Sequence, residues 1–490
     1  MNRDGRSPDE RYDVIVVGGG IHGVMLTLQA AARGLRPLLL EAGDYGHAAT
    51  WNSLRVLHGG LAGWQSGDWQ QSTSAIRERA WLANQFPDLT EPLPCLWPVY
   101  GGHRSESATV RWTMLIDNAW THLWTRQVAT DRRLPASRML SARSAHLVCS
   151  AIPQSHAGRS LRGAALWHEL ILTNPPRLML ELLRWATAQG AHMRNYFPVR
   201  QLVIEQQRVQ GVVARDQLSG TDFTLRAPVV FDCTAGQLAA LNQRLNHRSQ
   251  QESWLVAVNL LLHRKFVERC GVAQQSASSG QPPLMLLPRY GRLVAGTKYC
   301  SFDATRAETV PMVSEFQVAS LLNELNGTGL VDKLTLYDVA QIHSGRVRAS
   351  RAGSVRPASR SAIHHFTAAD GLAGLVEISS GGLTSARGVA ETALHSLWPR
   401  REASPTPVPQ RSLAPIDLQI WRTPSPEHRS AWIAALHQLV ETEDVFCWED
   451  LLLRRTDWAQ QVDDWRGLSR EISELSHQVG RPLELPLQVP

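Results

Sequence analysis

The sequence predicts an α/β protein that opens with a strand–helix–strand unit, and three features of its N-terminal part support this. Residues 13–17, DVIVV, form the short apolar run of a strand that is buried on both faces. Three glycines follow, and residues 21–33 then show a helical pattern with Gly34 where the helix would end. Residues 38–41, LLLE, are a second apolar run. The unit therefore predicts the start of a parallel sheet.

Helical and extended patterns alternate along the rest of the chain. Helices are expected at residues 70–86, 108–126, 176–188 and 384–397. Strands are expected near 195–204, at 202–216 and 222–232 as a β-meander that ends in a core strand, and at 255–262 and 292–297 in a second sheet. Four prolines within residues 401–415 predict a linker, and residues 428–478 are helical by pattern.

The composition is that of a globular protein of two or three domains. The 490 residues are 43% hydrophobic, with a mean hydropathy of −0.21. No run of 18 apolar residues exists, and residues 1–12 lack an apolar core, so neither a transmembrane helix nor a signal peptide is expected. The six cysteines form no CxxC pair, which argues against a zinc knuckle and favours a reducing cytoplasm.

The charge is moderately positive and evenly spread. Fifty basic residues, only three of them lysines, stand against 44 acidic ones and give a net charge of +6. Nucleic-acid binding would need a basic cluster or a known module, and neither is present. An anionic substrate and an anionic membrane surface both remain compatible with this charge.

The glycine run predicts a dinucleotide site. Residues 18–23, GGGIHG, fit the pattern G-x-G-x-x-G between a buried strand and a helix, and Glu41 ends the next strand. Gly18 would permit the tight turn, Gly20 would let the backbone approach a pyrophosphate, and Gly23 would let helix and strand pack closely. The helix N-terminus would face the phosphates, and Glu41 would accept hydrogen bonds from ribose hydroxyls. NAD and FAD both fit this pattern.

Several further segments decide between the two cofactors. The chain resembles the FAD-dependent glycerol-3-phosphate dehydrogenases, which are FAD oxidoreductases of the DAO type. The similarity lies at residues 12–60, 53–61 (SLRVLHGGL), 77–100, 163–199, 228–236 (PVVFDCTAG), 296–299 (GTKY), 343–348 (HSGRVR), 380–394 and 449–456 (EDLLLRRT). The resemblance implies FAD, a Rossmann-type FAD-binding domain of the glutathione-reductase-like class, a substrate domain with an antiparallel sheet, and a helical C-terminal domain.

The resemblance also implies which residues surround FAD. Ser53, Arg55, His58 and Gly59 would border the isoalloxazine, and the backbone of Val199 would meet the adenine. The remaining contacts would come from Ala235 and Gly236 on the pyrophosphate side and from Gly381, Gly382, Leu383 and Thr384 before a helix that points at the flavin pyrimidine. The FAD domain would then comprise residues 1–62, 150–240 and 370–400, and the substrate domain 63–149 and 241–369. The linker would be 401–415 and the C-terminal domain 416–490.

The substrate site departs from the family pattern. This chain has Ala62, Gly63, Gly382 and Asn259 where the family has an arginine, a tyrosine, a lysine and a histidine, respectively. A buried phosphate without such cations would be costly to desolvate. The chemistry is therefore expected to persist with a changed substrate.

Three other cations are candidates for the substrate site. Arg348 and Arg360 match family arginines, with Arg346 competing for the same alignment, and Lys298 stands where the family has a small polar residue. The alternative for each is a solvated surface residue. His22, His58 and the pair His364–His365 are expected to be structural, and no metal site is predicted.

The predicted reaction is hydride transfer from the CH–OH group of a small substrate to FAD, with quinone or oxygen as acceptor. The alternatives are an amine or amino-acid oxidase of the same fold and a flavin-binding protein without turnover. A cytoplasmic location is expected, either free or on the inner face of the membrane. Residues 111–126, with Trp112, Trp120 and Trp124, fit a core helix first and an interfacial membrane helix second. The sequence predicts no particular oligomeric state.

Overall fold

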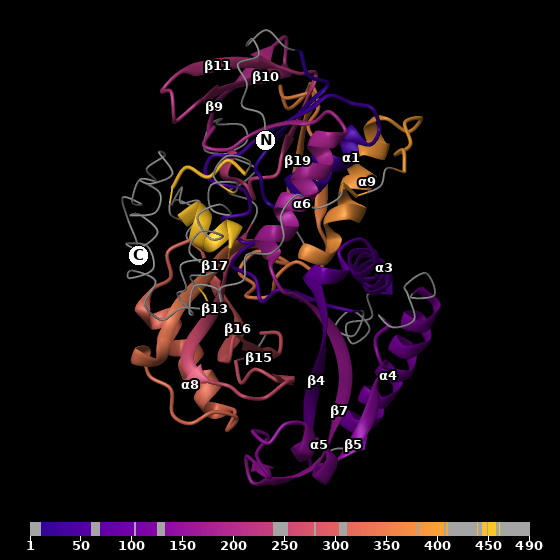
Figure 1. Cartoon of the computed structure of the whole chain (residues 1–490), viewed down its shortest axis with the longest axis vertical. Helices are drawn as coiled ribbons and strands as arrows, with labels where there is room; N and C mark the ends of the chain where they lie inside the picture. The colour runs from indigo at the N-terminus through magenta and orange to yellow at the C-terminus, as the bar shows by residue number, and fades with distance from the viewer. Residues whose placement is uncertain are drawn as a thin grey trace, which may run out of the picture.

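The computed structural model describes residues 11–59, 69–101, 104–124, 133–238, 253–278, 281–302, 311–379, 382–405, 408–409, 439, 443–447, 449–456 and 460. Two large sheets organise these residues, one in the upper and one in the lower half of Figure 1. Residues 60–63, 381, most of 401–415 and most of the C-terminal range 416–490 lie outside the described part, and so do the side chains of Trp120 and Trp124.

The first sheet is a six-stranded parallel sheet with one antiparallel edge. Its order is β18 (Ala362–His365), β19 (Leu375–Ser379), β12 (Val229–Asp232), β1 (Val14–Val17), β2 (Pro37–Leu40) and β8 (His192–Arg194), and only β18 runs against its neighbour. This sheet confirms the predicted parallel strands at residues 13–17 and 38–41.

Layers cover both faces of this sheet, which is why its strands read as unbroken apolar runs. One face packs on α1 (Ile21–Ala31), α6 (Pro175–Ala188) and α9 (Ala386–Leu397), with Val14 and Val16 pointing toward these helices. The other face packs on the β-meander β9 (Val199–Glu205), β10 (Arg208–Arg215) and β11 (Asp222–Arg226), toward which Ile15 and Val17 point. Every side chain of β1 is therefore buried.

The second sheet is almost entirely antiparallel. Its path is β17 (Val339–Arg348), β13 (Trp254–Lys265), β16 (Arg292–Ser301), β15 (Leu284–Arg289), β14 (Gly271–Gln274), β4 (Thr90–Tyr100), β7 (Arg159–Leu172) and β3 (Val56–Leu57), and β5 (Arg138–Ser141) and β6 (Ser155–His156) also pair with β7. Only β4 and β14 run parallel. We call the face that packs on α8 (Glu315–Gly327) the outer face and the face that contacts residues 49–54 the inner face.

The other described elements are short or lie outside the two sheets. These are α3 (Trp69–Gln85), α4 (Arg104–Trp124), α5 (Ala142–Val148) and the single turns η1 (Pro87–Leu89), η5 (Leu336–Asp338), η6 (Leu383–Ser385) and η7 (Asp450–Arg455). The helices predicted at 70–86, 108–126, 176–188 and 384–397 correspond to α3, α4, α6 and α9. In the C-terminal range, η7 is one π-helical turn. The predicted domain boundaries stay a prediction, and β7, within the range predicted for the FAD domain, pairs into the second sheet.

Helix α4 has one buried face and one exposed apolar stripe. Thr113, Met114 and Asp117 are buried, whereas Trp112 and Leu115 are 69% and 59% exposed. Leu123, two turns beyond Leu115, is also exposed. The structure thus gives α4 features of both predicted alternatives, a helix packed on the protein and an apolar outer surface. None of the described helices is both long enough and apolar enough to cross a membrane.

Candidate functional site

The glycine turn between β1 and α1 has the predicted geometry. Gly18 has a φ of +103°, and a Cβ there would lie 2.8 Å from the carbonyl oxygen of Cys233, at the end of β12. A Cβ on Gly23 would lie 1.9 Å from the carbonyl oxygen of Gly18. Gly18 and Gly23 are therefore required by the protein's own packing.

Gly20 is different, because nothing in the described chain requires a glycine there. Its φ is −72°, and the nearest atom to a Cβ would be Thr50 Oγ1 at 3.6 Å. The residue is the N-cap of α1 but makes no side-chain cap, and the first turn of α1 carries no acidic residue. The space in front of Gly20 therefore suits the close approach of a pyrophosphate to a helix N-terminus.

Glu41, directly after β2, is hydrogen-bonded to the glycine turn. Its buried carboxylate accepts hydrogen bonds from the backbone N–H groups of Gly19 at 2.5 Å and Gly43 at 2.8 Å. Its carbonyl accepts from Phe197 N at 2.7 Å, which brings the start of β9, at Val199, beside it. The carboxylate is thus part of the turn itself, and its predicted role toward a ribose stays a prediction.

The segment after β12 completes this end of the site. The N–H and hydroxyl of Thr234 donate to the Asp232 carboxylate at 2.8 and 2.6 Å. Ala235 and Gly236 follow with φ values of +55° and +82°. Because Cys233 touches Gly18, these two residues follow a segment in contact with the glycine turn, and their predicted role on the pyrophosphate side of FAD stays a prediction.

Residues 53–59 connect the first sheet to the second. Ser53 Oγ accepts from Arg55 N at 3.2 Å, and the Arg55 side chain, 2% exposed, donates to the carbonyl of Thr173 at 3.2 Å. His58 is half exposed and lies 3.7 Å from Glu169, whose carboxylate accepts from Gly59 N at 2.6 Å. These contacts anchor the segment to β7.

Glu169 is held as a carboxylate under this segment. Its burial raises the pKa, but the hydrogen bond and charge of His58, the charge of Arg79 and the N–H of Gly59 outweigh burial and lower it below the ordinary value. Arg79 Nη1 lies 3.3 Å from Glu169 and would collide with any side chain at Gly59.

The segment before α9 approaches the N-terminal end of α1. Gly382 has a φ of +131°, and its carbonyl accepts from Ser385 Oγ at 2.7 Å. Leu383 and Thr384 form η6 together with Ser385, and His22 Nε2 lies 3.3 Å from Ser385 Oγ. His22 is thus buried and in contact with η6, which is compatible with the structural role expected for it.

The inner face of the second sheet holds a polar group that includes His343, which sequence reasoning missed. His343 on β17 pairs in register with Asn259 on β13. Asn259 donates to the Asn52 carbonyl at 2.9 Å and accepts from Thr297 Oγ1 at 2.7 Å. The His343 ring packs against Trp51 with 4.8 Å between centroids. The amide nitrogen and the amide oxygen of Asn259 thus connect the segment at Asn52 to Thr297 on β16.

His343 is a neutral imidazole. It is 0% exposed, and burial, followed by the charges of Arg289 and Arg55, holds its pKa well below the ordinary value. Nε2 lies 3.2 Å from Gln341 Oε1, whereas Nδ1 has no hydrogen-bond partner among the described residues. Donation from Nε2 to Gln341 leaves the Nδ1 lone pair able to accept a proton.

The predicted cations lie elsewhere. Lys298 points to the outer face, where it forms an ion pair with Glu324 of α8, so the structure does not bring it together with Asn259. Arg348 donates to the Arg360 carbonyl at 3.1 Å in an exposed contact. Arg346 stacks on Trp254 at 4.6 Å. We therefore leave these cations out of the catalytic proposal below.

Two further groups of side chains contain possible metal ligands. His364 packs on Phe366, and His365 lies 3.1 Å from Ser396 Oγ, so each histidine has a structural neighbour. The cysteines are less scattered than the sequence suggests. Cys149, Glu268 and Cys270 bring their ligand atoms within 4.8 Å of one another on the described part of the chain.

Comparisons with known proteins agree with this site. The family model described as FAD dependent oxidoreductase matches residues 13–395. The chain is 28% identical over 432 residues to a glycerol-3-phosphate dehydrogenase of Synechocystis sp., covering 83% of this chain and 75% of that protein. It is 25% identical over 342 residues to the alpha-glycerophosphate oxidase of Enterococcus casseliflavus, covering 68% of this chain. The chain spans 54% of that oxidase and 63% of a Mycobacterium leprae glycerol-3-phosphate dehydrogenase.

Solved structures share the fold. The glycerol-3-phosphate dehydrogenase from Bacillus halodurans complexed with FAD matches with a TM-score of 0.61 and 20% identity, covering 97% of this chain and 81% of that one. L-Proline dehydrogenase from P. horikoshii matches with a TM-score of 0.58 and 14% identity, covering 81% and 96%. The glycine turn, the open space at Gly20 and the matched family model agree on the cofactor. The chain therefore belongs to the FAD dependent oxidoreductase family and is an FAD-dependent oxidoreductase.

Proposed function

We propose that this enzyme oxidises the CH–OH carbon of a small hydroxylated anion and that His343 takes the hydroxyl proton at Nδ1. The observation that carries the proposal is the buried, neutral imidazole whose Nδ1 has no partner among the described residues. A general base must meet the substrate unprotonated, and the lowered pKa of His343 keeps its Nδ1 lone pair available. A substrate anion held by Arg55 and Arg289 would offset the two charges that lower this pKa and would make the ring a better proton acceptor. Trp51 and Gln341 hold the ring in one orientation.

The charge around His343 favours an anionic substrate. Arg55 and Arg289 are 2% and 6% exposed, and both lie close enough to His343 to lower its pKa. Arg289 donates to the Leu54 carbonyl at 2.8 Å, which fixes its position at the inner face. A buried guanidinium is a good partner for a carboxylate or phosphate. Because Gly382 and Ala62 replace two cations of the glycerol-3-phosphate dehydrogenases, we propose a substrate other than glycerol 3-phosphate.

FAD, held by the turn at Gly18–Gly23 and the segments around Ala235 and Gly382, would supply the hydride acceptor. The protein's part is to bind and orient the substrate. Arg55 and Arg289 would hold its anionic group, and Asn259 would keep the strand carrying Thr297 in register with residues 49–54. Nδ1 of His343 would then receive the hydroxyl proton as the C–H bond breaks.

An anaerobic reduction assay tests this proposal on the FAD-loaded protein. The panel comprises glycerol, glycerol 3-phosphate, small 2-hydroxy acids and small amino acids, with loss of flavin absorbance as the readout. We expect 2-hydroxy acids to bleach the flavin fastest. His343→Gln should slow bleaching by about 100-fold or more while the flavin spectrum is retained. His365→Gln, at the exposed end of β18, is the matched control and should react at the wild-type rate.

The other outcomes separate the alternatives. Bleaching by amino acids alone would replace CH–OH oxidation with amine oxidation. Rapid bleaching by glycerol 3-phosphate would mean that Arg55 and Arg289 take over from the cations missing at Ala62 and Gly382. No bleaching by any compound would favour a flavin-binding protein without turnover. An unchanged rate in His343→Gln would refute the role of this histidine.

We also propose that α4 contacts a membrane surface, which favours quinone over oxygen as the electron acceptor. The support is the exposed stripe of Trp112, Leu115 and Leu123 on an amphipathic helix. The double variant Trp112→Ala with Leu115→Ala should sediment less with lipid vesicles than the wild type. Tyr337→Ala, 97% exposed on η5, is the control. Equal sedimentation of all three proteins would contradict the contact.

A further inference from the structure

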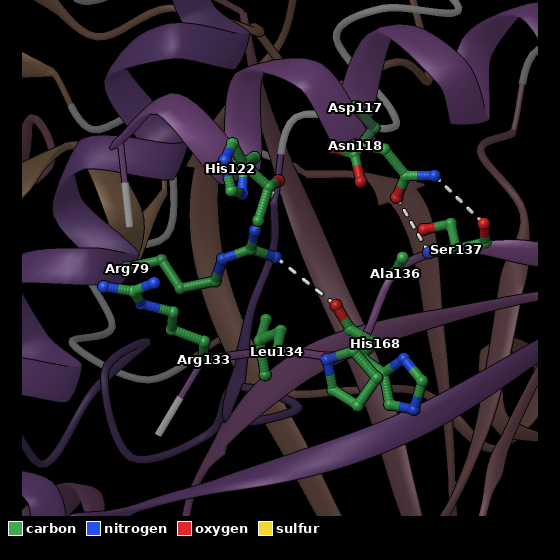
Figure 2. A pocket seen from close by; sticks show the side chains of 11 residues that line it. Arg79, Asp117, Asn118, His122, Arg133, Leu134, Ala136, Ser137 and His168 are labelled. Carbon is green, nitrogen blue, oxygen red and sulfur yellow. Dashed lines mark hydrogen bonds between the residues drawn. The ribbon is translucent and has the colours of Figure 1, made fainter. Parts of the chain in front are cut away.

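A cavity with several charged and polar side chains lies beside β7, and it includes no residue of the glycine turn. It has a volume of about 180 Å³ and lies among α3, α4, residues 133–137 and β7 (Figure 2). The polar side chains that define it are those of Arg79, Asn118, His122, Arg133, Ser137 and His168. None of its lining residues belongs to the group around His343, so this cavity is separate from the proposed substrate site.

The polar part of the cavity lining consists of hydrogen-bond donors, cations and one carboxylate. Two guanidinium groups and two imidazoles face one carboxylate, that of Asp117. The lining thus holds two cationic groups and one carboxylate, and the Arg79 guanidinium also pairs with Glu169 outside the lining. Nδ1 of His168 is buried and has no hydrogen-bond partner among the described residues. This lining suits a small anion with several acceptor oxygens.

The walls of the cavity are held in place by the protein itself. Asn118 of α4 donates to the Ser137 carbonyl at 3.0 Å and accepts from the Ser137 N–H at 2.7 Å, as Figure 2 shows. Arg79 of α3 reaches across to Thr121 Oγ1 at 3.3 Å and to the carbonyl of His168 at 3.4 Å. A ligand would therefore meet a preformed cavity.

Arg79 connects the cavity to the segment at Gly59. Its Nη1 lies 3.3 Å from the Glu169 carboxylate, which accepts from Gly59 N at 2.6 Å. An anion bound beside Arg79 competes with Glu169 for the same guanidinium. Occupation of the cavity should therefore alter how firmly residues 58–59 are anchored to β7.

We propose that this cavity binds a small phosphate-type oxyanion, either free or as the headgroup of an anionic lipid. The guanidinium groups of Arg79 and Arg133 and the Ser137 hydroxyl of the same lining support this class of ligand, and the inference does not depend on the substrate proposed above. The free anion and the lipid headgroup share the same chemistry at Arg79 and Arg133. The exposed stripe of α4 lies on the helix that lines the cavity, so both sources are tested.

The test titrates the full-length, FAD-loaded protein with inorganic phosphate at constant ionic strength, by calorimetry. A parallel arm measures sedimentation with vesicles of phosphatidylglycerol and of phosphatidylcholine. We expect saturable binding in at least one arm and at least a tenfold loss in Arg133→Gln. His122 is exposed, so His122→Gln should fold, and it should also weaken binding. This variant replaces Arg133→Gln in the test if Arg133→Gln does not fold. Arg159→Gln removes one exposed charge outside the cavity and should bind like the wild type.

The arms identify the source of the oxyanion. Phosphate binding that Arg133→Gln abolishes supports a free oxyanion, and binding only to phosphatidylglycerol vesicles, lost in the same variant, supports a lipid headgroup. Binding that persists in Arg133→Gln and His122→Gln but is lost in Arg289→Gln would place the anion at the substrate site and overturn the inference. No binding in either arm would also overturn it.

Discussion

Asn259 and Lys298 lie on neighbouring strands, yet their side chains leave opposite faces of the second sheet. Asn259 contacts residues 49–54 on the inner face, and Lys298 pairs with Glu324 on the outer face. Glu324 also accepts from Ser276 Oγ at 2.6 Å and Ser278 Oγ at 2.5 Å, so the lysine completes a partly buried polar cluster. The placement of each side chain, rather than its type, decides whether it can serve the flavin site.

For this reason we expect Lys298→Met to affect stability and leave the chemistry unchanged. Removing one partner of this partly buried ion pair should cost about 1–3 kcal/mol in unfolding free energy. Chemical denaturation measures this loss, and anaerobic flavin reduction should proceed at the wild-type rate. Lys265→Met, at the exposed end of β13, is the control. If flavin reduction became tenfold slower with FAD still bound, Lys298 would take part in the chemistry at the flavin and this prediction would be wrong.

The open space at Gly20 leads to a prediction about FAD binding. Because a Cβ there would meet only Thr50 Oγ1 at 3.6 Å, Gly20→Val should leave the fold intact but block the pyrophosphate, giving a colourless protein. Gly23→Ala, whose Cβ would lie 1.9 Å from the Gly18 carbonyl, should instead destabilise the fold. Flavin absorbance and thermal melting distinguish the two effects. Yellow Gly20→Val protein would show that FAD does not approach this turn.

The elements around the site are joined by buried contacts of α1. This helix is buried along almost its whole length because α6 and α9 cover it on the sheet. Its first turn meets η6 through His22 and Ser385, at the two segments predicted to hold FAD. Burial lowers the pKa of His22 to about 4. Burial at the junction of α1 and α9 therefore keeps the His22 imidazole neutral near pH 7.

This makes stability depend on pH at the α1–α9 junction. Below pH 6.5 the unfolded chain protonates His22, whereas the folded protein does so only near pH 4, so the unfolding free energy falls as pH decreases across this window. The loss is on the order of 3 kcal/mol. His22→Gln should remove this part of the pH dependence, measured by denaturation at pH 7 and pH 4.5. Identical pH profiles for the two proteins would contradict the assignment.

For the whole molecule, the described C-terminal residues are packed against the N-terminal part of the site. Buried Asp44 accepts from Arg454 Nε at 2.7 Å, Arg455 Nη1 at 2.5 Å and Asn195 Nδ2 at 2.9 Å. Trp51, which packs on His343, donates to the Leu453 carbonyl at 2.9 Å. Residues 44–52 are thus fixed by contacts about 400 residues away in sequence.

Asp44→Asn tests this long-range attachment. Burial raises the pKa of Asp44, but Arg455 and Arg454 outweigh it and hold that pKa well below its usual range. The carboxylate therefore stabilises the fold above the pKa of the unfolded state, near 3.8, and this contribution is lost as pH falls through the lower folded value. At pH 7 the variant should lose about 3–5 kcal/mol of unfolding free energy. Asp222→Asn, in an exposed pair with Arg215, should change stability little.

The sequence alone predicted what depends on neighbouring residues. The turn at Gly18, Gly20 and Gly23 and the helices α1, α3, α4, α6 and α9 follow from local spacing and from apolar periodicity. These features recur wherever a strand buried on both faces leads into a helix. A dinucleotide site and the α/β class could therefore be predicted before any tertiary contact was known, whereas the choice of FAD over NAD came from the resemblance to a known family.

Only the tertiary structure decided which side chains meet. His343 and Asn259 are 84 positions apart in sequence, and the register of β13 with β17 pairs them. Alternate residues of a strand point to opposite faces of the sheet. Because the pairing of β13 with β16 is irregular between Val258 and Leu260, the face toward which Lys298 points could not be predicted from the sequence. The placement of Arg79 behind Gly59 likewise depends on packing between α3 and β7. Strand register and long-range packing, which no local sequence pattern encodes, therefore determined the position of His343 and the cavity beside β7.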